Sequence, residues 1–196
     1  MSECNHEKTK VQMISKEYFG KRFKAKATVC EECGSTLWDR DLQMKFNEWL
    51  TALGKEDRDR FVLQVNLTKR TFDCVERMVK EFPGSDPTAL LRALSIVYMK
   101  CALKSPELNE VVEKVFEGDV FKDLSTAGEK KKLNIYFKPV THVEIQSWAN
   151  LAEMSSSKFI EEAVLRMLSF YIEKDPVMRK YWESTFRPEL EMILAA

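Results

Sequence analysis

An internal repeat constrains this chain more than any other feature of its sequence. When the 196-residue sequence is aligned with itself at an offset of 70 residues, without a gap, apolar positions fall on apolar positions over nearly 60 residues. The paired positions include Leu63 with Leu133, Val65 with Ile135, Leu67 with Phe137, Val75 with Ile145, Ala93 with Ala163, and Pro106 with Pro176. Few of the paired residues are identical, but two units built on one plan are the economical interpretation.

Each copy begins with a segment in which apolar and polar residues alternate, at residues 63–69 and 133–139. Such alternation predicts a strand with one buried face. Apolar residues then recur at spacings of three and four on either side of a breaker, at residues 83–86 and 155–157, which predicts two helices joined by a turn. A third helical segment is expected after the proline that both copies share. Because an isolated strand leaves its backbone groups unpaired, we expect the two strands to pair with each other.

A strand followed by helix, turn and helix, with polar side chains alternating outward on the strand, resembles the ribbon-helix-helix family of DNA-binding proteins, the Arc/MetJ/CopG-like group. The segment LNIYFKP followed by MSSSKFIEEAVLRML is the closer match, and QVNLT followed by GSDPTALLRAL is looser. The resemblance covers roughly residues 60–105 and 130–175. It implies a mainly α fold with short β, in which a single-chain pseudo-dimer of two ribbon-helix-helix units shares a two-stranded antiparallel ribbon.

The resemblance also implies a function, insertion of the ribbon into the DNA major groove. Asp86 departs from the pattern, because an acid beside a phosphate repels it. The alternative interpretation of the outward polar residues is a solvated strand face. Carried over by position, the base-reading residues would be Gln64, Asn66, Thr68, Asn134, Tyr136 and Lys138, and the second-helix N-termini near Ser85, Ser155 and Ser156 would contact phosphates through backbone N–H groups.

Charge supports this interpretation locally but not globally. The chain has 31 lysines and arginines and 31 aspartates and glutamates, so its net charge is zero. Phosphate contacts normally supply much of the affinity for DNA, and binding is therefore expected to be weak, salt-sensitive or dependent on a partner. Basic residues nevertheless flank both predicted strands, namely Arg58, Arg60, Lys69, Arg70, Lys130, Lys131, Lys132 and Lys138.

The N-terminal segment contains a set of metal-ligand residues in the pattern C-x-H…C-x-x-C. These residues, Cys4, His6, Cys30 and Cys33, suit one tetrahedral Zn²⁺. Two alternating segments between them flank a turn at residues 18–21, which predicts a small zinc-binding β-hairpin. The arrangement is similar to a zinc ribbon, including those of MqsA-type antitoxin regulators, and the metal would be structural because so short a hairpin has little core.

Two points about this segment stay open. The C-x-H spacing is unusually tight, and a set of cysteines without metal is the alternative. The hairpin is also locally basic, so it can contact either DNA or a protein. The predicted domain boundaries are 1–36 for the zinc ribbon, 37–57 for a linking helix, 58–120 for the first unit with its extra helix, and 128–190 for the second.

The sequence offers no enzyme signature. It contains no nucleophile with a matched histidine and acid and no phosphate-binding glycine loop, and His142 is expected to be a cap or surface residue. No apolar run could span a bilayer and no signal peptide is evident, so we expect a cytoplasmic protein without a membrane partner.

The sequence therefore predicts a DNA-binding transcriptional regulator whose partner is double-stranded DNA, with self-association or a protein partner as further options. One alternative is an accessory protein that marks a DNA site of a plasmid or mobile element. Another is a protein-binding adaptor or antitoxin-like inhibitor that has lost DNA binding.

Overall fold

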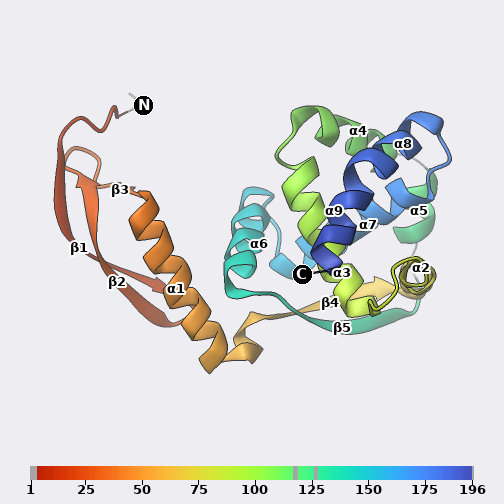
Figure 1. Cartoon of the computed structure of the whole chain (residues 1–196), viewed down its shortest axis with the longest axis horizontal. Helices are drawn as coiled ribbons and strands as arrows, with labels where there is room; N and C mark the ends of the chain where they lie inside the picture. The colour runs from red at the N-terminus through yellow and green to blue at the C-terminus, as the bar shows by residue number, and fades with distance from the viewer. Residues whose placement is uncertain (1–3, 117–118, 126–127, 196) are drawn as a thin grey trace. The chain divides into compact units, whose positions relative to one another are not determined.

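The computed structural model of the chain describes residues 4–116, 119–125 and 128–195 (Figure 1). Residues 1–3 of the predicted zinc ribbon and residues 117–118 of the first predicted unit lie outside these ranges. By its internal contacts the chain divides into two compact units. The first comprises Met1–Phe61 with Lys138–Val140, and the second comprises Val62–Phe137 with Thr141–Ala196.

The first unit is a three-stranded antiparallel sheet in the order β1-β2-β3, with helix α1 packed against strand β2. Phe19 and Gly20 close the β1–β2 hairpin, both with positive φ, at 53° and 68°. Two left-handed residues in succession match the right-handed twist of a tight hairpin. The bounds are β1 Thr9–Tyr18, β2 Lys21–Cys30, β3 Thr36–Leu37 and α1 Arg40–Glu56, followed by the 3₁₀ turn Arg58–Phe61.

The core of the first unit lies between α1 and the alternating buried residues of β2. The α1 helix starts at Asp39, whose carboxylate accepts a hydrogen bond from the Leu42 N–H at 2.7 Å. The Phe46 ring on α1 then lies 5.1 Å from the Phe23 ring on β2, between ring centroids. The buried apolar side chains that meet here include Phe23, Ala25, Ala27, Val29, Leu42, Phe46, Leu50 and Leu53.

The second unit combines a two-stranded antiparallel sheet with a mainly helical body. Strand β4 pairs with β5 so that Leu63 lies opposite Ile135 and Gln64 lies opposite Asn134. The bounds are β4 Val62–Thr68, α2 Lys69–Val79, α3 Pro87–Val97, α4 Pro106–Phe116, α5 Asp119–Ser125, β5 Lys130–Tyr136, α6 Pro139–Leu151, α7 Ser156–Ile172, α8 Pro176–Tyr181 and α9 Arg187–Leu194, with π-helical segments at Tyr98–Ala102 and Trp182–Phe186.

Local capping explains where several of these helices begin. The Thr68 hydroxyl caps α2 by accepting from the Thr71 N–H at 3.2 Å. Asp86 caps α3. Ser155 caps α7, where a breaker precedes a helical pattern in the sequence. Every helix in the described part of the chain is too short or too polar to span a bilayer.

The fold class predicted from the sequence, a pseudo-dimer of two ribbon-helix-helix units sharing a ribbon and carrying a small zinc-binding hairpin, is wrong. The chain is 60% helical with small antiparallel sheets of three and two strands, and the mixed α/β content is the part of the prediction that agrees. The hairpin belongs to a three-stranded sheet packed against α1. In the second unit, helices from the two repeat copies pack against one another.

Packing between the repeat copies gives the physical reason for this correction. Helices α3 and α4 of the first copy both pack against α7 of the second. Val65, Leu94, Ile135 and Val164 accordingly lie in one continuous buried cluster. Apolar spacing indicates where helices and strands fall, but it does not indicate which of them share a core.

Candidate metal centre and nucleic-acid interface

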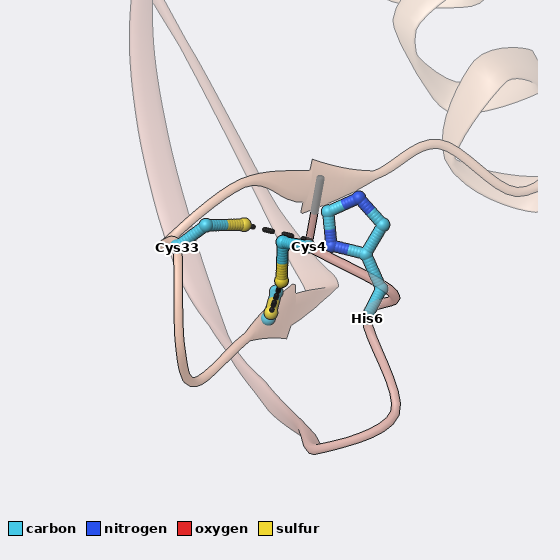
Figure 2. Close-up of side chains that lie close together, drawn as sticks. Cys4, His6 and Cys33 are labelled. Atoms are coloured by element: carbon cyan, nitrogen blue, oxygen red, sulfur yellow. Dashed lines mark hydrogen bonds between the residues drawn. The ribbon is translucent and has the colours of Figure 1, made fainter. Parts of the chain in front are cut away.

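The four predicted ligand residues gather at one end of the three-stranded sheet. Cys4 and His6 precede β1, Cys30 is the last residue of β2, and Cys33 lies in the turn between β2 and β3. Their ligand atoms all lie within 4.8 Å of one another, so this cluster can hold a metal ion. Figure 2 shows Cys33 and His6 pointing toward each other across the loop, with Cys4 between them.

The distances within this cluster are those of a compact coordination sphere. The Sγ atoms of Cys4 and Cys30 lie 3.5 Å apart, and the Cys33 Sγ lies 3.5 Å from the His6 Nδ1. In a tetrahedral zinc site with Zn–S bonds of about 2.3 Å, sulfur atoms are separated by about 3.8 Å. A small adjustment of side chains would therefore bring all four donors to one ion.

Backbone hydrogen bonds hold the loop that carries two of the cysteines. Gly34, in the left-handed region at φ 71°, donates its N–H to the Cys30 carbonyl at 3.0 Å. The Cys30 N–H donates in turn to the Ser35 carbonyl at 2.9 Å. The Glu31 N–H binds the Lys8 carbonyl at 2.9 Å, which joins the N-terminal segment to this loop. These bonds therefore fix the turn that carries Cys30 and Cys33 and join it to the segment that follows Cys4 and His6.

Hydrogen bonds shift the pKa values of these thiols in opposite directions. The backbone of Cys33 lowers the pKa of Cys30, although burial opposes the effect. The Ser35 side chain is the main cause of the lowered pKa of Cys33. The backbone of His6 lowers the pKa of Cys4, but hydrogen bonds with the other two thiols and burial raise it to about 11. Because a metal binds the thiolate, the donors to Cys30 and Cys33 favour the binding form.

The β4–β5 sheet gathers the other predicted site residues, with its apolar face against the core. Val65 and Ile135 are 1% and 0% exposed, whereas Gln64 and Asn134 on the opposite face are exposed and directly paired. The pairs on that outer face are Val62 with Tyr136, Gln64 with Asn134, Asn66 with Lys132, and Thr68 with Lys130.

Not every predicted base-reading residue is available on this face. The Thr68 hydroxyl donates to the Leu124 carbonyl at 2.8 Å as well as capping α2. Asn66 is half-buried, and its backbone N–H donates to the Glu161 carboxylate at 2.7 Å. Lys138 follows the end of β5 and belongs to the first compact unit. Gln64 and Asn134 are therefore the best-placed pair.

The serines predicted to contact phosphate lie at the N-terminus of α7 in the second copy, but not at the cap of α3 in the first. Ser155 caps α7 and Ser156 is its first residue. Ser85 is not the cap of α3, because Asp86 has that role, and the Ser85 hydroxyl donates to the Phe82 carbonyl at 2.8 Å. The repeat aligned Ser85 with Ser155, but the cap shifts by one residue in the first copy.

Some of the basic residues around the β4–β5 sheet form ion pairs with acidic residues. Lys69 pairs with Asp73 at 3.0 Å and Arg70 with Asp123 at 2.8 Å. The Lys131 ammonium lies 3.5 Å from the centroid of the buried Phe72 ring. Among the described residues no ion pair involves Lys130 or Lys132, which are exposed on the outer face. These two lysines are its clearest cationic groups.

Other residues complete the comparison with the sequence. His142, expected to be a cap or surface residue, is buried in α6, and burial lowers its pKa. Glu161 was not anticipated, because nothing local in the sequence shows that an α7 carboxylate reaches the edge of β4.

Comparison with known proteins found no matching family model, curated protein or solved structure.

Proposed function

We propose that this protein binds double-stranded DNA through the outer face of the β4–β5 sheet and acts as a transcriptional regulator. The observation that carries the proposal is the register, which places Gln64 directly opposite Asn134 on an exposed face. Both side chains are amides, and an amide can bind an adenine edge with two hydrogen bonds in the major groove. An exposed amide pair backed by a buried apolar face supports readout of bases.

The dimensions of the sheet also support the proposal. Each strand has seven residues, which corresponds to a length of roughly 23 Å. Two strands lie about 4.8 Å apart, and the B-DNA major groove is about 12 Å wide. A two-stranded sheet with its side chains therefore fits the groove in width.

Lys130 and Lys132 provide the electrostatic part of the interface. They lie on the outer face beside the amide pair, opposite Thr68 and Asn66. Since the protein has no net charge and several nearby cations are already paired, few phosphates would be neutralised. The expected DNA affinity is therefore modest. Because few phosphates are contacted, it should fall only gradually as the salt concentration rises.

The test begins with selection of bound duplexes from random DNA, followed by fluorescence anisotropy on the selected duplex at several salt concentrations. Lys130→Ala should weaken binding to the selected duplex and to a duplex of scrambled sequence alike. It should also lower the slope of log affinity against log salt concentration by about one. Lys45→Ala, at an exposed position on α1, is the control. If no duplex is enriched, a protein-binding adaptor becomes the better description of this scaffold.

We further propose that the cysteine and histidine cluster holds one structural Zn²⁺. Thiolate and imidazole donors suit zinc, and four protein ligands leave no open coordination position for catalysis. Elemental analysis of the purified protein should find about one zinc per chain, and Cys30→Ser should lose it. Cys101→Ser, which changes a half-buried thiol outside the cluster, should retain it. Full metal retention by Cys30→Ser would contradict the assignment.

A further inference from the structure

The second unit contains a cavity of about 300 Å³ that is separate from both sites described above. It opens between the π-helical segment after α3, helix α4, the end of α6 and helix α7. Its volume lies at the lower end of the range for small-molecule sites, enough for a ligand of about ten heavy atoms. The lining is partly aromatic and partly polar, and its main members are Tyr98, Trp148, Phe159, Asn109, Glu113 and Arg166.

A departure from regular helix forms one wall of the cavity. The chain from Tyr98 to Ala102 is π-helical, and the Leu103 N–H donates to the Tyr98 carbonyl at 3.1 Å. Both Tyr98 and Leu103 line the cavity. A π-helical turn has poorer backbone geometry than an α-helix and is found frequently at functional sites. This wall is therefore consistent with a binding role.

The polar end of the cavity offers hydrogen-bond acceptors. Two acidic side chains, Glu113 and Glu162, line the cavity together with one basic side chain, Arg166. The Arg166 guanidinium is paired with the Glu113 carboxylate and also lies 3.9 Å from that of Glu162. Lys158 approaches Glu162 at 3.6 Å from the exposed side. Because the arginine is already paired, an entering anion would compete with two carboxylates for it.

The aromatic end suits an apolar or aromatic group. The Arg166 guanidinium lies 5.8 Å from the centroid of the Tyr98 ring, so this ring already has a cation beside it. Trp148 and Phe159 extend the aromatic surface. Glu113, at 43% side-chain exposure, faces water and keeps acceptor capacity beyond its bond to Arg166.

From these contacts we propose that the cavity binds a small primary amine with an aromatic or apolar body. Its ammonium group donates hydrogen bonds to the Glu113 carboxylate, and its apolar body lies against Trp148 and Phe159. This inference does not depend on the proposed DNA binding, since it concerns a different surface of the same unit.

The test is calorimetric titration of the full chain with 2-phenylethylamine, with phenylacetate as an anion of similar size. The amine should bind in a saturable way and the anion should bind at least tenfold more weakly. Glu113→Gln should lower the amine affinity about tenfold, because a charge-assisted hydrogen bond becomes a neutral one. Equal affinities for amine and anion, or no measurable amine binding, would overturn the proposal.

A matched pair of variants ties binding to this cavity. Ala152→Trp places a large side chain at the mouth of the cavity from an exposed position, and it should abolish amine binding. Asn150→Trp adds the same side chain at an exposed position that does not line the cavity, and it should bind like the wild type. Circular dichroism checks that both variants fold. Undiminished binding by a folded Ala152→Trp protein would contradict the assigned location.

Discussion

The β1–β2 hairpin of the first unit has apolar residues on its outer face, whereas the outer face of the β4–β5 sheet in the second unit is mainly polar. On β1 the outer residues Val11 and Met13 are 70% and 60% exposed, but in the second unit the exposed outer pair is Gln64 and Asn134. Small cores commonly need a further constraint such as a bound metal. A metal bound by the cluster at the end of the first sheet would supply such a constraint, while the second unit has the larger buried core.

Metal removal should produce the largest difference in stability between the two units. Chelation or Cys30→Ser should destabilise the first unit by several kcal/mol, since binding of a structural zinc is worth on the order of 10 kcal/mol. Hydrogen exchange should then show lost protection in β1 and β2 and unchanged protection in α3 and α7. Equal protection of the hairpin with and without metal would show that its own core suffices.

The packing of the second unit can be tested at Ile135, which is 0% exposed. Ile135→Ala should lower the free energy of unfolding by about 2–5 kcal/mol through lost burial and a cavity. Val11→Ala, at an exposed position in the first unit, should change it by less than about 0.5 kcal/mol. Urea denaturation followed by circular dichroism measures both. Similar effects of the two changes would remove the contrast between the units.

Close packing in the first unit includes Gly54 of α1. A Cβ added there would lie 2.3 Å from the Cγ of Pro139. Gly54→Ala should therefore cost about 1–3 kcal/mol, even though alanine is the better helix former. Gly128→Ala meets no atom within 4 Å and is the control. A stabilised Gly54→Ala protein would show that the ring of Pro139 moves away easily.

A substitution of Thr68 on β4 should have a smaller effect, and it tests protein stability separately from DNA recognition. Thr68 caps α2, so Thr68→Ala should cost about 1 kcal/mol of stability. Because its hydroxyl is occupied by Thr71 and Leu124, the change should leave the preference between DNA sequences unaltered. Thermal denaturation and anisotropy measure the two properties. Lost sequence preference with unchanged stability would return Thr68 to the base-reading set.

The sequence located elements more reliably than contacts. The alternation at residues 63–69 is close to β4, Val62–Thr68, and the predicted turn at 18–21 contains the hairpin turn. The spacing C-x-x-C also anticipated a gathered ligand set. These features depend on local patterns of polarity and on turn chemistry, which neighbouring residues determine.

Long-range packing was beyond the reach of the same patterns. The packing of α3 against α7 joins helices that are far apart in the sequence, and the bond from the Asn66 N–H to Glu161 joins residues 95 positions apart. The strand β3 has two residues, too few for a periodic signal. The capping role of Thr68 also required the structure, because a threonine at the end of a strand suits an outward-facing position equally well.

The central claim concerns Gln64 and Asn134, and one ratio tests it most directly. That ratio is the dissociation constant for a scrambled duplex divided by that for the selected duplex, measured for the wild type and for the Gln64→Ala/Asn134→Ala protein. If the pair reads bases, the double substitution should cost about 1–3 kcal/mol per residue on the selected duplex and leave the scrambled one unchanged, so the ratio falls toward one. An unchanged ratio in a folded double variant would contradict readout by this face.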